Sequence, residues 1–200
     1  MTRYYKMGKT RSNRARLLNK TARVYTDSHY SSNDGMLTTV WGPGMWHYLH
    51  TMSFNYPVAP TCDEKRHYQR FVLSLQHVLP CGKCRRNLTR TLRQFPLTWE
   101  RMKSRETFSK YVYELHEKVN RMLNKTSGLS YDDVRERYEH FRARCAKPKS
   151  CKTAKRRPVS EKGCTEPLYG EKAKCVLKIV PQTVKCETLQ IDRKCIKSRK

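Results

Sequence analysis

Residues 41–57 have the sequence WGPGMWHYLHTMSFNYP, and the spacing of their apolar side chains predicts an α-helix. The apolar residues recur at steps of three and four, which places them on one helix face: Met45, Leu49, Met52 and Tyr56. The Gly-Pro-Gly run at 42–44 marks the beginning, because a proline suits the first helical turn, where its missing N–H needs no partner. The proline at position 57 marks the end, because it disfavours the helical conformation in the residue before it.

Similar apolar patterns continue along the chain to about residue 145. A second helix is expected between Thr61 and Pro80, a third from Cys81 onward, a long and regular fourth, and a short fifth at about 132–144. Their apolar positions are Phe71, Leu75, Val78, Leu79, Leu88, Leu92, Phe108, Val112, Leu115, Val119, Met122 and Leu123. Because short loops join these segments and no strand pattern precedes residue 146, we expect an all-α fold, an antiparallel four-helix bundle with a short fifth helix.

The two ends of the chain differ in composition from its middle. Residues 1–40 predict a basic flexible N-terminal arm, residues 41–145 a helical domain, and residues 146–200 a basic, irregular, cysteine-containing C-terminal tail. The net charge is +26, from 43 Lys and Arg against 17 Asp and Glu. Such a charge attracts polyanions and acidic partners without specifying either. We expect no membrane span and no secretory signal, since no sufficiently long apolar run occurs.

The motif best suited to chemistry is Pro80-Cys81-Gly82-Lys83-Cys84. Two cysteines separated by two residues can close a small disulfide ring. The field of a helix N-terminus and the adjacent basic residues favour the thiolate over the thiol, and the thiolate is the species that attacks in exchange. On its own the motif fits redox chemistry, a zinc site or neither. A zinc site needs four ligands, and no second C-x-x-C is present in the sequence.

The first and fourth predicted helices carry polar and aromatic side chains four residues apart. Trp46 and His50 form one such pair, and His116 and Asn120 form another, with Lys125 beyond it and Tyr56 at the end of the first helix. Beside a dithiol, this set is able to hold a flat, polar-edged cofactor by ring stacking, edge hydrogen bonds and a lysine–phosphate contact. The alternative for either pair is ordinary packing in a helical core.

Taken in order, these motifs resemble the Erv/ALR family of flavin-linked sulfhydryl oxidases. Residues 41–57 are similar to the WGxxxWxxLHxxxxxYP opening of that family. Residues 80–88 are similar to its PCxxCxxxL element, and residues 116–125 to its HxxVNxxLxK element. The resemblance covers roughly residues 41–140, and both tails lie outside it.

The resemblance implies an FAD-binding helical bundle that forms disulfide bonds and usually acts as a homodimer. Cys84 would be the sulfur next to the flavin, and Cys81 the sulfur that exchanges with incoming thiols. The residues implied to contact FAD are Trp46, His50, Tyr56, His116, Asn120 and Lys125. Electrons would pass from a thiol-containing protein substrate to the Cys81–Cys84 disulfide, then to FAD and O₂, with release of H₂O₂. The resemblance implies no metal ligand.

The chain departs from the family pattern at three positions. Many members carry a C-x16-C disulfide, whereas the corresponding residues here are Tyr113 and Ser130. The aromatic residue of the fifth helix is Tyr138, where cellular members are expected to have tryptophan. In lacking these features, the chain resembles the compact members of the family that large DNA viruses encode. We therefore expect a viral protein that acts in the host cytoplasm or the virion.

Other classes of function remain open at this point. A basic nucleic-acid-binding or virion structural protein with zinc-binding cysteines would also explain the charge and the cysteine count. A bundle that only binds partners is a third possibility. The tail offers further cysteines, some of which are candidates for a thiol shuttle: Cys145, Cys151, Cys164, Cys175, Cys186 and Cys195.

Overall fold

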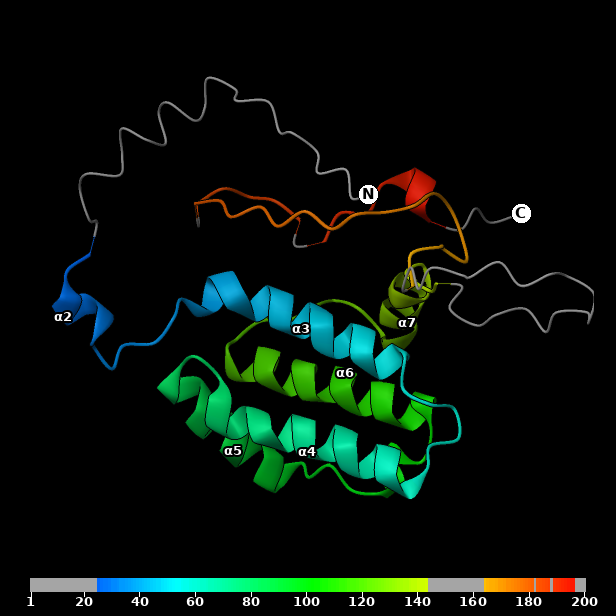
Figure 1. The fold of residues 1–200 in the computed structure, drawn as a ribbon, viewed down its shortest axis with the longest axis horizontal. Coiled ribbons are helices and arrows are strands. Elements are labelled where there is room, and N and C mark those ends of the chain that lie inside the picture. Colours follow the sequence, from blue (N-terminus) through cyan, green and yellow to red (C-terminus); the bar gives the residue numbers. More distant parts are fainter. Residues whose placement is uncertain (1–24, 144–163, 182, 188, 197–200) are drawn as a thin grey trace, which may run out of the picture. The chain divides into compact units, whose positions relative to one another are not determined.

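The computed structural model describes residues 25–143, 164–181, 183–187 and 189–196, and its main feature is a bundle of helices (Figure 1). The bundle consists of α3 (Thr38–Phe54), α4 (Cys62–Val78), α5 (Gly82–Gln94), α6 (Arg105–Met122) and the short α7 (Tyr131–Glu139). The described residues also include α2 (Asp27–Tyr30) and two 3-10 turns, Glu100–Met102 and Arg193–Cys195. The predicted all-α bundle with a short fifth helix is confirmed.

The chain forms two compact units, residues 1–35 and residues 36–200. The first contains α2, a single helical turn that the sequence did not predict. Thr26 starts it by accepting a hydrogen bond from the N–H of His29, whose side chain in turn accepts from the N–H of Thr26. Within the described residues no helix has the length and apolarity needed to span a bilayer.

The beginning of α3 differs from the prediction. The helix starts at Thr38, so Pro43 lies in its interior rather than in its first turn. Tertiary contacts explain the extension, because the indole N–H of Trp41 donates to the carbonyl of Met36 at 3.1 Å. The N–H of Met36 in turn donates to the carbonyl of Pro80 at 2.8 Å, which joins this segment to the turn before α5. These contacts offset the hydrogen bond that a proline inside a helix cannot donate.

Local capping fixes the start of three other helices. A capping box pairs Thr61 with Glu64 at α4, Ser104 with Thr107 at α6, and Ser130 with Asp133 at α7. In each box the first side chain accepts from the backbone of the third helical residue, whose own side chain accepts in return. The fifth helix ends at Glu139, several residues before its predicted end, and an isolated bridge joins Ala143 to Pro167.

The core lies between α3, α4 and α6. Tyr56 is 0% exposed, its hydroxyl donates to the carbonyl of Met102 at 3.0 Å, and its ring packs against Tyr68 and Phe108. The other buried apolar residues of the cluster are Leu49, Val72, Leu75, Leu97, Tyr111, Val112 and Leu115. Most of the predicted apolar stripes of the first, second and fourth helices therefore meet in one core. The prediction was wrong for Val78, Met122 and Leu123, which lie at the ends of these stripes and are 66%, 37% and 50% exposed.

Tyr113 and Ser130, the two positions at which the family resemblance would lead one to expect a disulfide, have other partners here. The Tyr113 hydroxyl donates to the carbonyl of Leu129 at 2.8 Å, and its ring meets Tyr131 edge-on. Ser130 caps α7. Hydrogen bonding and packing thus hold the end of the α6–α7 loop against α6 without a covalent bridge.

We expect Tyr56→Phe to lower the free energy of unfolding by about 1–2 kcal/mol, because it leaves the buried carbonyl of Met102 without its donor. Urea denaturation followed by circular dichroism measures the change. Tyr30→Phe is the matched control, since Tyr30 is 82% exposed. Equal stabilities for both variants would contradict the assigned role of Tyr56.

Candidate functional site

Cys81 and Cys84 form a disulfide bond at the N-terminus of α5, with their Cα atoms 5.1 Å apart. Cys81 is the N-cap residue of this helix, and its sulfur accepts a hydrogen bond from the N–H of Cys84 at 3.2 Å. The Cys84 sulfur also lies 3.7 Å from the hydroxyl of Thr38, in the first turn of α3. The disulfide is half-buried, and its Cys84 side faces α3.

A second cluster forms where α3 packs against α6. The Trp46 ring stacks on His116, with ring centres 4.0 Å apart and planes 8° from parallel. His50 is buried, and its Nε2 lies 3.0 Å from Nδ1 of His116. The structure thus brings together three of the residues predicted to contact a cofactor.

The other three predicted contacts lie outside this cluster. Tyr56 is in the core described above. Asn120 is one turn beyond His116, and its side-chain amide donates to the carboxylate of Glu117 at 3.0 Å. Lys125 is exposed in the turn after α6, where its N–H donates to the carbonyl of Asn120 at 2.9 Å. Asn120 and Lys125 therefore extend from the cluster toward the C-terminal end of α6.

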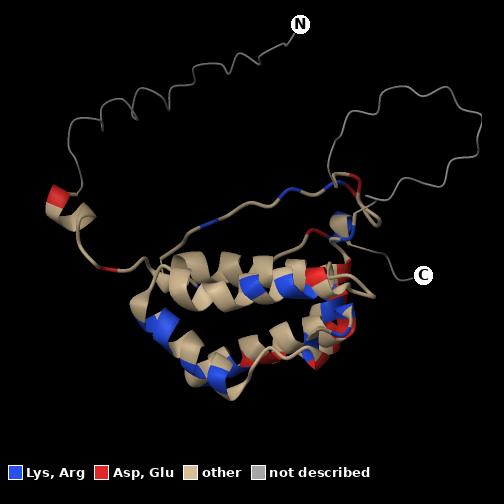
Figure 2. Cartoon of the chain, turned by 60° about the horizontal axis from the view of Figure 1, so that its bottom comes forward, with Lys and Arg blue, Asp and Glu red and all other residues tan. Residues whose placement is uncertain are grey.

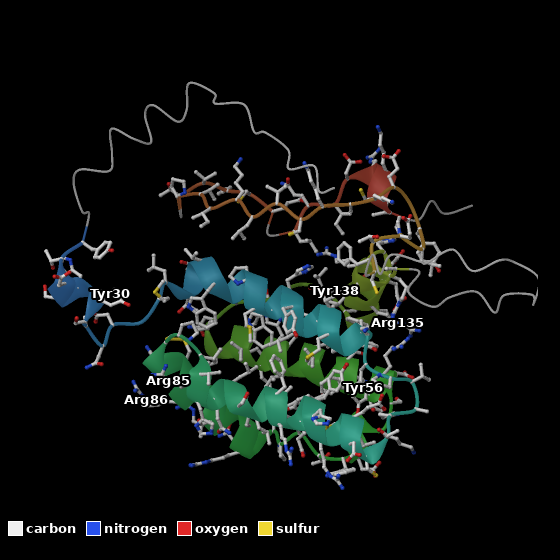
Figure 3. The ribbon with its side chains drawn as sticks, in the orientation of Figure 1. Tyr30, Tyr56, Arg85, Arg86, Arg135 and Tyr138 are labelled. Atoms are coloured by element: carbon white, nitrogen blue, oxygen red, sulfur yellow. A yellow bond between two sulfur atoms is a disulfide. The ribbon has the colours of Figure 1, made fainter. Side chains whose placement is uncertain are left out.

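Residues of α7 and one further histidine complete the cluster. The Tyr138 ring, labelled in Figure 3, stacks on Phe54 and lies 5.3 Å from the His50 ring. Its hydroxyl is 3.2 Å from Nδ1 of His47. His47 was not among the predicted site residues. The spacing of His47, His50 and Phe54 at i, i+3 and i+7 is the signal that would have placed all three on one face.

Burial keeps the two central histidines neutral at physiological pH. Desolvation, together with nearby His116 and His47, lowers the pKa of His50 to about 3. Burial also lowers the pKa of His116 to about 4, against the opposing effect of Glu117. Of the two facing nitrogens, one therefore donates and the other accepts. Burial likewise raises the pKa of Tyr138 to about 12, so its hydroxyl stays protonated.

One polar atom of the cluster lacks a partner. Nδ1 of His50 is buried and makes no hydrogen bond within the protein. A buried polar atom of this kind costs roughly 1–3 kcal/mol unless a bound group satisfies it. Stacked aromatic rings around an unsatisfied imidazole nitrogen fit a flat, polar-edged ring system, as the predicted FAD has.

The disulfide and the cluster are both in contact with α3. Thr38 touches the Cys84 sulfur, and Trp46 is eight residues further along, which corresponds to about 12 Å of helix. An elongated ligand lying along α3 is therefore able to reach both groups.

The remaining cysteines do not add to this site. Cys62, Cys175 and Cys186 are free and exposed, and Cys195 is free and half-buried. Cys164 takes part in a disulfide, whereas Cys145 and Cys151 lie outside the described residues. In the part of the chain that the structure describes, no group of three or more His, Cys, Asp or Glu side chains is placed to hold a metal ion.

Comparison with known proteins consistently finds FAD-linked sulfhydryl oxidases. The family model for the Erv1/Alr family matches residues 43–139. A "probable FAD-linked sulfhydryl oxidase" of Acanthamoeba polyphaga mimivirus is 38% identical over 99 residues, which is 50% of this chain and 68% of that protein. The mitochondrial FAD-linked sulfhydryl oxidase ERV1 of Saccharomyces cerevisiae is 30% identical over 42% of this chain and 43% of that protein.

A solved structure is also similar. The crystal structure of the yeast Erv1 core superposes with a TM-score of 0.48 and 24% identity, covering 60% of this chain and 93% of that one.

We expect the ring protons of His50 and His116 to keep their NMR chemical shifts as the pH falls from about 7 to about 5, because both folded-state pKa values lie below this range. The unfolded chain takes up protons on these histidines below a pH of about 6.5, and the folded chain does not. Stability is therefore fully present above this pH and falls as the pH decreases.

For His50 the expected slope is about 1.4 kcal/mol per pH unit below a pH of about 6.5, ending near the folded-state pKa. Urea denaturation at several pH values measures it. A ring titration with a midpoint near 6.5 would show that the pair is solvated and would refute the buried neutral arrangement.

Proposed function

Because the chain belongs to the Erv1/Alr family, we propose that it is an FAD-linked sulfhydryl oxidase in which Cys81 and Cys84 are the redox-active pair. The observation that carries the proposal is the closed Cys81–Cys84 disulfide held against the helix that also presents Trp46 and His50. The overall reaction converts two thiols and O₂ into a disulfide and H₂O₂.

Substrate oxidation begins with thiol–disulfide exchange at Cys81. A substrate thiolate attacks the Cys81 sulfur, the Cys81–Cys84 bond breaks, and Cys84 leaves as a thiolate. A second substrate thiol then attacks the substrate sulfur of this mixed disulfide, which forms the product disulfide and releases reduced Cys81. Cys84 is the sulfur that leaves, because the Thr38 hydroxyl lies 3.7 Å from it and is placed to stabilise its thiolate.

The protein stabilises the sulfur charge during this exchange. The N–H of Cys84 already points at the Cys81 sulfur, and the N-terminal end of α5 favours negative charge. When bound, FAD supplies the acceptor for the two electrons of the reduced pair, with O₂ as the final acceptor.

The proposed cofactor contacts fall into two groups. Trp46 and His116 offer a stacked aromatic surface, and Nδ1 of His50 offers one hydrogen bond to a ring edge. Asn120 and Lys125 extend this surface along α6 toward the polar part of the cofactor. Tyr56 acts through the core, by fixing the end of α3 that carries His50.

The alternative of a nucleic-acid-binding or virion structural protein with zinc-binding cysteines has no support. The relatives are named as oxidases, and the described cysteines outside the disulfides do not gather into a metal site.

We further propose a viral origin, with the enzyme active in the host cytoplasm or the virion. The mimivirus relative at 38% identity and the absence of cysteine at positions 113 and 130 support this proposal. We also propose a division into an N-terminal arm (1–40), an oxidase domain (41–145) and a C-terminal tail (146–200), with α3 starting at Thr38, inside the first of these ranges.

A homodimer is proposed for the same protein. An apolar hollow of about 430 Å³ opens between α3 and the end of α4, lined by Trp41, Gly44, Met45, Tyr48, Leu75, Val78, Leu79 and Pro80. Tyr48 is 53% exposed and Val78 66% exposed, and because both line this hollow, they present one contiguous apolar surface to the solvent. A second copy of the chain is the occupant that the family resemblance implies.

Sedimentation velocity tests the dimer. We expect the wild-type protein to sediment as a dimer and Val78→Glu to shift it toward the monomer, because the new carboxylate would be desolvated in the interface. Val58→Glu is a matched control, since Val58 is also 66% exposed but lies in the α3–α4 loop. A monomeric wild-type protein, or equal effects of both substitutions, would refute this interface.

The activity is tested on the purified full-length chain. We expect a yellow protein with a visible flavin band that consumes O₂ when given dithiothreitol. Cys84→Ala should retain the flavin but oxidise dithiothreitol only at background rate, because no disulfide then connects substrate and cofactor. Cys62→Ala is the control, since Cys62 is a free, exposed cysteine at the start of α4. A colourless protein that consumes no O₂ after reconstitution with FAD would overturn the proposed function.

A further inference from the structure

We propose that the basic surface of α5 around the disulfide selects substrate segments in which the reacting cysteine is flanked by acidic side chains. This inference rests on the proposed function, since it assigns a substrate class to the same Cys81–Cys84 site.

Among the described helices, α5, which begins at the disulfide, has the largest excess of basic over acidic residues. Within Gly82–Gln94 it carries Lys83, Arg85, Arg86, Arg90 and Arg93 and no acidic residue. Figure 2 shows Lys and Arg in blue and Asp and Glu in red, with the acidic residues on other parts of the fold. Helices α4, α6 and α7 all have acidic residues in their first turn, whereas α5 has none.

Two guanidinium groups lie close to Gly82, the first residue of α5, between the two cysteines. Measured from the position that a Cβ atom on Gly82 would occupy, a terminal nitrogen of Arg85 is 3.6 Å away and one of Arg86 is 3.7 Å away. Arg85 is fixed there, because it also donates to the carbonyl of Leu79. Lys83, exposed between the two cysteines, adds a third positive charge.

Among the residues that the structure describes, no acidic side chain forms an ion pair with these groups. The ion pairs among the described residues are Arg66–Asp63, Arg142–Glu139 and Lys172–Glu166, and none of them includes a residue of α5. Arg86 is exposed, so its guanidinium is available to a partner. Guanidinium groups bind carboxylates through paired, planar hydrogen bonds, which makes acidic side chains the matching chemistry.

The position of the charges decides between an acidic peptide and a nucleic acid. A thiol that reacts with Cys81 brings its neighbouring residues to within about 3–7 Å of that sulfur, since each residue spans about 3.3–3.6 Å. Carboxylates next to the substrate cysteine therefore meet Arg86 and Lys83 directly. A nucleic acid bound at the same place would block the disulfide and supply no thiol.

Competing peptide substrates test this inference. Two dithiol peptides of equal length are compared, one with aspartate and glutamate beside its cysteines and one with lysine. We expect kcat/KM to be higher for the acidic peptide by about tenfold at low salt, and the difference to shrink as salt is added. Equal values for the two peptides, with dithiothreitol still oxidised, would overturn the inference but leave the proposed function intact.

A pair of variants separates the local surface from the net charge of the whole chain. Arg86→Gln and Arg135→Gln each remove one positive charge, but Arg135 is on α7, at the other end of the bundle (Figure 3). We expect Arg86→Gln to reduce the acidic-to-basic kcat/KM ratio by roughly three- to fivefold, the effect of one exposed ion pair, and Arg135→Gln to leave it unchanged. Equal reductions would refute selection at the disulfide.

Lys83→Gln repeats the test independently of any effect of Arg86 on folding. Its side chain is exposed and is not part of the α5 hydrogen-bond network. We expect the same direction of change in the ratio, and an unchanged ratio in both Arg86→Gln and Lys83→Gln would reject the proposal. Failure of the wild-type protein to oxidise dithiothreitol would instead reject the oxidase activity itself.

Discussion

Helix α3 packs against α6, and this contact places Trp46 and His50 against His116 while Leu49 and Leu115 enter the same core. The first turn of α3 also meets Cys84 through Thr38. A single helix therefore sets the position of the disulfide and of the aromatic cluster together. Any displacement of α3 would alter both groups. Its N-terminal end is held by the hydrogen bond from Met36 to Pro80, and its C-terminal end by the buried Tyr56.

The pair formed by His50 and His116 lowers the folding stability of the free protein. Both imidazoles are held neutral by burial, and Nδ1 of His50 has no partner in the protein. Unsatisfied polar atoms are rare in native cores, and they concentrate where a ligand completes the hydrogen bonding. At the proposed FAD site, a bound group with a matching polar edge would recover the stability lost at this position and would couple folding to cofactor binding.

The structure also shows where part of the positive charge of the chain lies. A net charge of +26 by itself describes only a long-range attraction to anions. The structure shows that α5 carries five of these charges without an acidic residue and that two guanidinium groups lie beside the redox disulfide. Whole-chain charge raises the local concentration of acidic partners, and the α5 surface orients those partners for exchange.

The sequence by itself determined the main helices of this protein, though not the single turn of α2, because helix spacing and the C-x-x-C motif depend on residues only three or four positions apart. The helical stripes, the start of α4 at Thr61 and the cap of α5 at Cys81 follow from such local patterns. Tertiary structure alone decided what lies side by side. The extension of α3 to Thr38, the burial of Tyr56 against Met102, the contact of His47 with Tyr138 and the pairing of His50 with His116 join residues 44 to 91 positions apart. Such contacts depend on how one helix is rotated and shifted against another, and that register is fixed by packing of the whole core rather than by any local pattern.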